Sequence, residues 1–478
     1  HSGPGGRARQ FRAEGYTFDM GPSWYWMPDV FERFFEQFGR NRSDYYDLVR
    51  LDPSYTVRWN DGSAWDIPAT YADLKALLER EEPGAGAQLD KFMAEAEFKY
   101  NVGINKLVYK PGQSLMEFAD PGFLKGVFRL QVFSSIAKHI AKHFKSPKIR
   151  QLMAFPVLFL GALPEQTPAL YSLMNYADIK GGTWYPPGGM YEIVKGMVKL
   201  AEELGVKFRY NCNIESLSPE NGRVCHLQTS QGELTADIVV AGADYHHVDR
   251  HLLPERYRQY SEKYWNKRVM APSSLIYYVG IDRKLPNLHH HTLFFDADFE
   301  KHAAEIYTTP NWPDTPLFYL CAPSVTDASV APEGHENLFF LIPVAAGLED
   351  TPELRERYWD GLCERVETQT GVDIRPHVQY KRSFAQSDFI NDYNAFKGNA
   401  YGLANTLFQT AIFKPRMQHK HLKNLYFTGQ LTVPGPGVPP SLISGEVVAK
   451  LISKQHPPTS TPATSWNSTT TSPAVPAG

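Results

Sequence analysis

The segment near the C-terminal end constrains the fold of this chain more than any other part of it. A short apolar strand from Asn424 to Phe427 runs into Gly429, and a helix is expected from Ser441 to about Lys454. The loop between them is rich in glycine, which lets a backbone approach a ligand closely, and in proline, which holds it rigid. A helix N-terminus also favours an anion such as a phosphate. The segment therefore predicts a ligand-binding loop at the carboxyl end of a parallel strand, in preference to a plain strand–loop–helix turn.

The same alternation of strands and helices occurs earlier in the chain, from Trp184 onward. A helix is predicted over Tyr191 to Leu204 and a strand over Val206 to Tyr210, where apolar side chains alternate. The continuous apolar run from Ile238 to Ala243 is typical of a strand buried on both faces. Together these patterns predict an α/β fold with a nucleotide-binding parallel sheet.

Length and composition exclude several classes of protein. At 478 residues the chain is too long for one compact core, which predicts two or three domains. Its 49 Lys and Arg against 52 Asp and Glu give a net charge of −3, so no nucleic-acid partner is expected. The four cysteines form no CxxC pair, which argues against a disulfide scaffold or a zinc site and favours a reducing compartment. No apolar run reaches the ~18 residues of a membrane-spanning helix.

A basic segment interrupts this pattern. Residues 121–164 contain no Asp or Glu, and residues 122–150 carry seven Lys or Arg. Apolar and basic side chains fall on opposite helical faces there, the apolar ones being Phe133, Ile136, Ala137, Ile140 and Phe144 and the basic ones Lys138, Lys142 and Lys145. Such a helix can lie in an anionic membrane interface. It can also pack its apolar face into the core and leave a basic edge in solvent, which is the commoner arrangement.

Several motifs in the chain match one known family. They are Gly5-Gly6-Arg7-Ala8-Arg9 with Phe18 to Trp24, Trp184 to Met190, Asn394 to Gly402, and Gly429 to Ser441 followed by Gly445. In combination these motifs resemble the bacterial-type phytoene desaturases, and the resemblance extends over about residues 3 to 455. That family belongs to a flavoprotein superfamily that also includes amine oxidases and carotenoid isomerases. The resemblance implies an FAD-dependent oxidoreductase that desaturates a long acyclic carotenoid precursor.

The resemblance also implies which residues contact FAD. The N-terminal residues would lie along the FAD pyrophosphate and the flavin ring. The backbone of Ile214 would hold the edge of the adenine. The residues from Gly429 onward would flank the pyrophosphate and the flavin ring. In chain order the expected contacts are Gly5, Gly6, Arg7, Gly21, Pro22, Ile214, Ala241, Gly242, Gly429, Gln430, Gly437, Val438 and Pro439. No metal is implied, and no residue is identified as catalytic.

The family pattern begins with a strand, a GxGxxG turn, a helix and a second strand ending in an acidic residue, about 30 residues in all. None of this precedes Gly5, so we expect the chain to be a fragment that holds FAD poorly as it stands. The expected fold is α/β, with a Rossmann-like FAD-binding domain lacking this βαβ unit, a mixed α+β substrate domain and a helical membrane-associating subdomain. The expected division is 1–28, 182–250 and 420–456 for the FAD domain, 29–181 and 251–419 for the substrate- and membrane-binding part, and 457–478 for a disordered tail rich in Pro, Ser and Thr.

The implied reaction transfers a hydride from an allylic carbon of the polyene to flavin N5, with loss of a proton from the neighbouring carbon. A hydrocarbon has no polar handle, so its binding must rely on buried apolar surface. Four residues are candidate bases by type alone, with a structural role favoured for each: Asp388, His246, His247 and Arg150. The run His289 to His291 is expected to decorate a loop rather than to bind a metal.

The expected partners are the lipid-soluble polyene, a membrane surface bound through residues 122–150, and quinone or oxygen as electron acceptor. These partners predict a cytoplasmic protein associated peripherally with the inner face of the cell membrane. Two alternatives stay open. One is a carotene cis–trans isomerase or another polyene oxidase on the same scaffold, and the other is a catalytically inactive carotenoid-binding protein.

Overall fold

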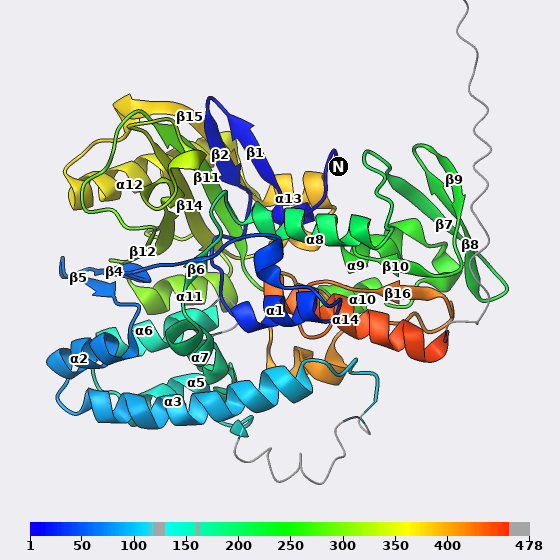
Figure 1. Ribbon diagram of the computed structural model, residues 1–478, viewed down its shortest axis with the longest axis horizontal. Helices are drawn as coiled ribbons and strands as arrows, with labels where there is room; N and C mark the ends of the chain where they lie inside the picture. The colour runs from blue at the N-terminus through cyan, green and yellow to red at the C-terminus, as the bar shows by residue number, and fades with distance from the viewer. Residues whose placement is uncertain (115–116, 118–129, 159–162, 458–478) are drawn as a thin grey trace, which may run out of the picture.

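A seven-stranded sheet is the largest element of the fold (Figure 1), in a computed structural model that describes residues 1–114, 117, 130–158 and 163–457. The strand order is β15-β11-β14-β13-β12-β4-β5. Neighbouring strands are antiparallel, apart from the parallel pair β12 and β4. The strands are β4 (Tyr55–Trp59), β5 (Ala64–Ile67), β11 (Ser273–Ile281), β12 (His291–Phe295), β13 (Phe318–Cys321), β14 (Glu336–Val344) and β15 (Val378–Phe384).

Both faces of this sheet are buried, each in its own apolar core. In β11, Tyr277 and Val279 belong to a core that includes side chains of α12 (Pro352–Thr370). Ile276 and Tyr278 belong to the larger core on the opposite face. Because successive side chains of a strand point to opposite faces, one continuous apolar strand supplies both cores.

A group of helices contributes to the larger core. They are α2 (Tyr71–Glu81), α3 (Ala85–Val102), α5 (Ile136–His143), α6 (Pro147–Leu158) and α7 (Leu173–Tyr176). They lie together beside the β4–β5 end of the sheet (Figure 1). Among the described helices, none is long and apolar enough to cross a membrane.

Residues 121–129 and 159–162 of the basic segment lie outside the described residues. In the described part, Ile136, Ile140 and Phe144 are buried in the larger core, so the apolar face of α5 packs inward. The three lysines of the opposite face are exposed, and Phe133 is 82% exposed. Of the two arrangements considered for this helix, the structure has the core-packed one with a basic edge in solvent.

The third region holds the predicted ligand-binding loop. The parallel strands β10 (Val239–Ala241) and β16 (Leu425–Phe427) pair here, and β16 leads through the loop into α14 (Val438–Gln455). Beside them lies an antiparallel meander of β7 (Ile214–Glu220), β8 (Arg223–Thr229) and β9 (Gly232–Thr235). The helices of this region are α8 (Tyr191–Glu203), α9 (Tyr245–His247) and α10 (Glu262–Asn266).

Three expectations for this region are wrong in detail. The residues from Val206 to Tyr210 form no strand, and their large side chains are 36–50% exposed, because no strand of the described chain pairs with them. β10 is not buried on both faces, since Val240 is 44% exposed and β16 is its only partner among the described strands. α14 begins at Val438 rather than Ser441, because the first turn of a helix tolerates proline.

The N-terminal segment crosses from the loop region to the seven-stranded sheet. Its hairpin of β1 (Gln10–Ala13) and β2 (Tyr16–Asp19) packs aromatic rings of Phe11 and Phe18 on Tyr278. The Tyr278 hydroxyl donates to the carbonyl of Met20 at 2.7 Å, which fixes the turn that follows β2. The remaining elements are β3 (Val49–Arg50), β6 (Trp184–Tyr185), α1 (Pro28–Glu36), α11 (Phe299–Tyr307) and α13 (Gln386–Tyr393).

Candidate functional site

The first turn of the chain is held against a segment 392 positions later. Arg7 lies in the short 3-10 helix Gly6–Ala8, and its Nη2 donates to the carbonyl of Asn399 at 3.2 Å. Its guanidinium carbon lies 4.9 Å from the ring centroid of Tyr393. Burial lowers the pKa of Arg7, and the nearby Asp244 carboxylate opposes that shift. A buried guanidinium is costly unless it is paired, so this position favours an anion close by.

Gln430 brings the C-terminal loop to the same place. Its side-chain amide donates to Asn399 Oδ1 at 2.9 Å. In the reversed amide orientation, its oxygen accepts from Arg7 Nη2 at 3.3 Å. The two glycine-bearing segments from opposite ends of the chain therefore meet across Asn399, in the arrangement that a single dinucleotide site requires.

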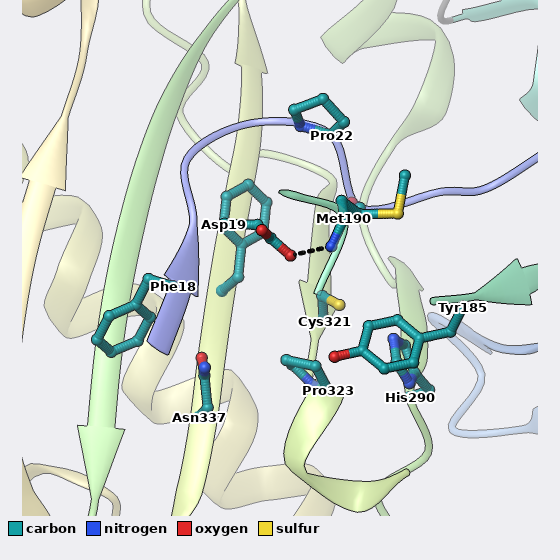
Figure 2. A pocket seen from close by; sticks show the side chains of 11 residues that line it. Phe18, Asp19, Pro22, Tyr185, Met190, His290, Cys321, Pro323 and Asn337 are labelled. Carbon is teal, nitrogen blue, oxygen red and sulfur yellow. Dashed lines mark hydrogen bonds between the residues drawn. The ribbon is translucent and has the colours of Figure 1, made fainter. Parts of the chain in front are cut away.

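The turn after β2 closes onto the N-terminal loop. A Cβ placed on Gly21 would lie 2.7 Å from the Arg7 carbonyl oxygen, so this close approach requires glycine. Asp19, at the end of β2, accepts from the backbone N–H groups of Met190 at 2.6 Å and Tyr191 at 3.2 Å at the start of α8 (Figure 2). Burial raises the pKa of Asp19 to about 6, although these hydrogen bonds act in the opposite direction.

Asp244 is a second buried anchor of the site, and the sequence analysis missed it. It follows Gly242 at the carboxyl end of β10 and caps the short helix α9. Its carboxylate accepts from the backbone N–H of Phe396 at 3.2 Å and from Asn399 Nδ2 at 3.3 Å. An aspartate between an apolar strand and a helix has the pattern of an N-cap, and this signal was available in the sequence.

Ser444 fixes the loop after β16 to its own helix. Its Oγ accepts from the Gly429 N–H at 2.9 Å and lies 2.8 Å from Thr428 Oγ1 and 3.0 Å from Thr432 Oγ1. The Thr428 N–H donates to the carbonyl of Ala241 at 3.0 Å. The ends of β10 and β16 and the start of the loop therefore form one hydrogen-bonded unit.

The start of α14 presents few backbone donors. Gly437 precedes the helix, and Val438, Pro439 and Pro440 open it. Because proline has no N–H, Val438 alone of these three offers a backbone donor. The helix start therefore contributes its dipole and a rigid apolar surface, which suits a flat ring better than a pyrophosphate.

Two buried polar side chains face the middle of the same loop. A Cβ on Gly435 would lie 2.8 Å from Asn405 Oδ1 and 3.3 Å from Lys414 Nζ, and both side chains belong to residues that are 4% exposed. Burial alone lowers the pKa of Lys414 to about 7. Within the described chain, Asn405 Oδ1, Lys414 Nζ and Arg7 Nε are buried and have no hydrogen-bond partner. Such atoms are rare in folded proteins and indicate that the site takes a polar ligand.

The structure places three of the other predicted contacts, Gly5, Pro22 and Ile214, in different surroundings. A Cβ on Gly5 would lie 3.2 Å from the ring of Tyr191, which places the first loop on the start of α8. Pro22 lines a small cavity described below. Ile214 lies apart, at the start of β7, and the N-terminal segment reaches that region where the Asn211 N–H donates to the carbonyl of His1 at 2.8 Å. The contact of Ile214 with adenine stays a prediction.

The residues at the junction fit FAD. The cations Arg7 and Lys414 suit a pyrophosphate or an electron-rich ring edge. The amides of Asn405 and Gln430 suit the nitrogen and oxygen atoms of a flavin ring. The unpartnered buried atoms are therefore the groups that such a cofactor would satisfy.

The candidate bases all have contacts within the fold. Asp388 pairs with Arg355, the ring of His246 stacks on Phe396, the His247 N–H donates to Asp244, and Arg150 donates to the carbonyl of Phe144. The expectation that His289 to His291 decorates a loop is wrong for two of the three. His290 and His291 are 3% and 0% exposed, because the chain enters β12 inside the seven-stranded sheet at this point.

Comparisons with known proteins identify the family of this chain. The model of the flavin containing amine oxidoreductases matches residues 2–453. A carotenoid 3,4-desaturase of Haloarcula japonica is 42% identical over 450 residues, which are 94% of this chain and 91% of the relative. A zeta-carotene-forming phytoene desaturase of Myxococcus xanthus is 31% identical over 94% of this chain and 87% of the relative.

The fold has solved counterparts as well. A putrescine oxidase variant superposes with a TM-score of 0.59 at 10% identity, covering 94% of this chain and 91% of the other. Cyclohexylamine oxidase of Brevibacterium oxydans superposes with a TM-score of 0.55 at 13% identity and the same coverage. The chain belongs to the family of flavin-containing amine oxidoreductases. Within that family it is an FAD-dependent oxidoreductase of the bacterial carotenoid desaturase type.

Proposed function

We propose that this chain desaturates a long acyclic carotenoid of the phytoene type. The observation that carries the proposal is the junction of Arg7, Asn399 and Gln430, where segments from both ends of the chain meet and the buried Nε of Arg7 has no partner among the described residues. This junction is suited to FAD, and the relatives from Haloarcula japonica and Myxococcus xanthus, which match more than nine-tenths of the chain, are named as carotenoid desaturases.

FAD, when bound, accepts a hydride at N5. The substrate loses that hydride from one allylic carbon and a proton from the adjacent carbon, and a C=C bond forms between them. Quinone or oxygen takes the two electrons onward. The protein excludes water and orients the polyene through the larger core, where aromatic side chains of the seven-stranded sheet gather. Binding of a hydrocarbon there is worth roughly 25 cal/mol per Å² of buried apolar surface.

The test is production of pigment in a phytoene-producing host. Desaturation extends the conjugated system, so the extracted carotenoids should absorb at longer wavelength and have lost two hydrogens per step by mass. A product of unchanged mass but altered double-bond geometry would indicate a cis–trans isomerase instead. Unaltered phytoene, in cells that contain the folded flavoprotein, would contradict the proposal.

A second candidate concerns the position of the new double bond. The carotenoid 3,4-desaturase is 42% identical to this chain, against 31% for the phytoene desaturase of Myxococcus xanthus. This difference favours action at C3–C4 of a carotenoid that is already extensively conjugated. Parallel hosts that accumulate phytoene or lycopene separate the two candidates, because a 3,4-desaturase should convert only the second.

We also propose that further parallel strands pair with the free edge of β10, as in a complete dinucleotide-binding domain. Parallel sheets are normally covered on both faces, whereas Val240 is 44% exposed. The exposed alternating side chains of Val206, Phe208 and Tyr210 offer a second apolar edge nearby in sequence. Slow hydrogen exchange of the Val240 amide would support a further strand at this edge, and exchange at the rate of an unpaired amide would contradict it.

The domain division expected from the sequence goes with this proposal. Residues 1–28, 182–250 and 420–456 would act as the FAD-binding unit. Residues 29–181 and 251–419 would act as the substrate-binding unit, with the tail after 457 lying outside the described residues. Limited proteolysis with and without FAD tests the division, because FAD should protect the first set of segments selectively.

We also propose that the protein docks on a membrane. It would then lie peripherally on the cytoplasmic face of the cell membrane. The exposed Lys138, Lys142 and Lys145 with the exposed ring of Phe133 support it, because lysines bind anionic headgroups and an aromatic ring enters the interface. In liposome flotation, K138E/K142E should reduce binding to anionic vesicles at low salt several-fold. The charge-matched control K263E/K420E, at exposed lysines elsewhere, should not.

A further inference from the structure

Two buried histidines and a buried cysteine meet at the seven-stranded sheet. His290 and His291 lie at the start of β12, and Cys321 ends β13. The two strands pair antiparallel with His291 directly opposite Cys321. All three residues are at most 4% exposed, and one ligand atom from each lies within 4.8 Å of the others. Strand pairing thus assembles a cluster that no local spacing in the sequence shows.

The two imidazole rings are held through one nitrogen and left free at the other. His290 Nδ1 lies 2.9 Å from Thr326 Oγ1, and His291 Nδ1 lies 2.6 Å from the Tyr319 hydroxyl. Among the residues that the structure describes, Nε2 of both rings is buried and has no hydrogen-bond partner. This is the arrangement of metal-binding histidines, whose second nitrogen is fixed by a neighbouring polar group.

A small cavity adjoins the cluster. Its volume is about 20 Å³, and its lining includes Asp19, Tyr185, Met190, His290 and Cys321 (Figure 2). A space of this size holds one water molecule or one ion. The Asp19 carboxylate lines the same cavity and would compensate part of the charge of a cation bound there.

We propose that His290, His291 and Cys321 bind one thiophilic divalent cation of the Zn²⁺ type. Two imidazole nitrogens and one thiolate are ligands that Zn²⁺ prefers, and three protein ligands leave the fourth position to a water in the adjoining cavity. A thiolate does not suit Mg²⁺ or Ca²⁺, which prefer oxygen ligands. A bound cation would stabilise the thiolate form of Cys321. The ion ties β12 to β13 beside the turn that follows β2.

A second histidine cluster does not support the same inference. Glu95, His139 and His143 also place ligand atoms close together. However, the ammonium of Lys99 lies 3.5 Å from His139 Nε2 and would repel a cation there. The proposal is therefore confined to the cluster on β12 and β13.

The test is the metal content of the full chain, which does not depend on flavin or substrate. The protein is produced without a metal-affinity tag in medium containing Zn²⁺, dialysed against metal-free buffer and measured by mass spectrometry of the elements. We expect about one Zn²⁺ per chain. C321S and H291A should reduce it at least tenfold, whereas C363S, which changes another buried cysteine, and H289A, which changes the half-buried histidine before His290, should not. A variant could lose zinc because it misfolds and not because it lacks a ligand. Circular dichroism of each variant distinguishes these two causes.

Cobalt supplies an independent measurement. Protein produced with Co²⁺ should show a thiolate-to-metal charge-transfer band that is present in C363S and absent in C321S, and this band identifies the cysteine directly. The proposal is overturned if folded wild-type protein retains no stoichiometric Zn²⁺ or Co²⁺. It is equally overturned if folded C321S retains as much metal as the wild type. That result would assign the metal to other residues and leave water as the occupant of the cavity beside Cys321.

Discussion

The ammonium of Lys414 lies 3.3 Å from the position that a Cβ on Gly435 would occupy, so the lysine is held directly against the backbone of the cofactor loop. Among the described residues Lys414 Nζ has no hydrogen-bond partner, and burial lowers its pKa to about 7. A buried charge without a partner destabilises a folded protein. Lys414 therefore lowers the stability of the flavin-free protein. A polar ligand bound at this loop would supply a hydrogen-bond partner for its ammonium, so the residue is suited to a role in binding.

Replacing this lysine should separate stability from binding. We expect Lys414→Met to raise the urea midpoint of the flavin-free protein and to weaken FAD binding about tenfold, the equivalent of one charge-assisted hydrogen bond. Urea unfolding and titration of flavin fluorescence measure the two effects. Lys420→Met, at an exposed lysine on the same stretch of chain, should change neither.

The same lysine predicts a pH dependence of stability with a definite sign. Between pH 7 and about 10 the folded protein holds Lys414 neutral while the unfolded chain still binds the proton, so the free energy of unfolding should rise with pH. The gain relative to Lys414→Met should approach about 1.4 kcal/mol per pH unit in that range. Below pH 7 both states are protonated and the difference should be constant. A difference between the two proteins that does not vary from pH 7 to 9 would contradict the low pKa.

Two glycines near α14 should respond oppositely to alanine. Gly435 has a φ of +136° and its Cβ would lie 2.8 Å from Asn405 Oδ1, so Gly435→Ala should distort the loop and reduce both the free energy of unfolding and bound flavin. Gly445 lies within α14, and a Cβ there meets nothing within 4 Å. Gly445→Ala should therefore stabilise the protein, by about 0.5–1 kcal/mol. Thermal unfolding of the pair measures the contrast.

Ser444 should contribute far more to the free energy of unfolding than Ser441, which lies on the same helix. Ser444→Ala removes the acceptor of the Gly429 N–H and leaves the hydroxyls of Thr428 and Thr432 with fewer partners. A buried donor left without a partner costs about 1–3 kcal/mol. Ser441→Ala, one turn earlier, is the matched control and should cost less than about 0.5 kcal/mol. Equal losses from the two variants in urea unfolding would show that the Ser444 network contributes little.

The sequence predicted the parts of the site that depend on local chemistry. The loop after β16 follows from glycine and proline, whose backbone preferences act over a few residues. Whether the apolar face of α5 packs into the protein core or onto a membrane could not be predicted in this way. Its amphipathic pattern is the same for a membrane surface and for a protein core, and the neighbouring α3 and α6 decide between them.

The buried polar residues escaped prediction for a different reason. Asn399 and Lys414 are ordinary polar residues in their local context, and Asp244 shows only a helix N-cap there; all three acquire their place at the site from residues far away in the sequence. The same holds for Cys321, which meets His291 only through strand pairing. The error over Val206 to Tyr210 is also tertiary in origin, since an alternating pattern forms a strand only where another strand is available to pair with it.

Arg7 gives the most direct test of the junction between the two ends of the chain. Arg7→Ala removes a buried guanidinium that donates to Asn399 and, through a favourable amide orientation, to Gln430. Loss of a charge-assisted contact to the cofactor should weaken FAD binding by about 1.5–3 kcal/mol, or roughly ten- to a hundredfold. Arg7→Lys keeps the charge without the forked donor geometry, so it should recover only part of the affinity. Arg12→Ala, at an exposed arginine of β1, controls for the change in net charge. If Arg7→Ala and Arg12→Ala bound FAD equally well in fluorescence titrations, the junction of Arg7, Asn399 and Gln430 would be a structural contact alone, and the cofactor would have to lie elsewhere.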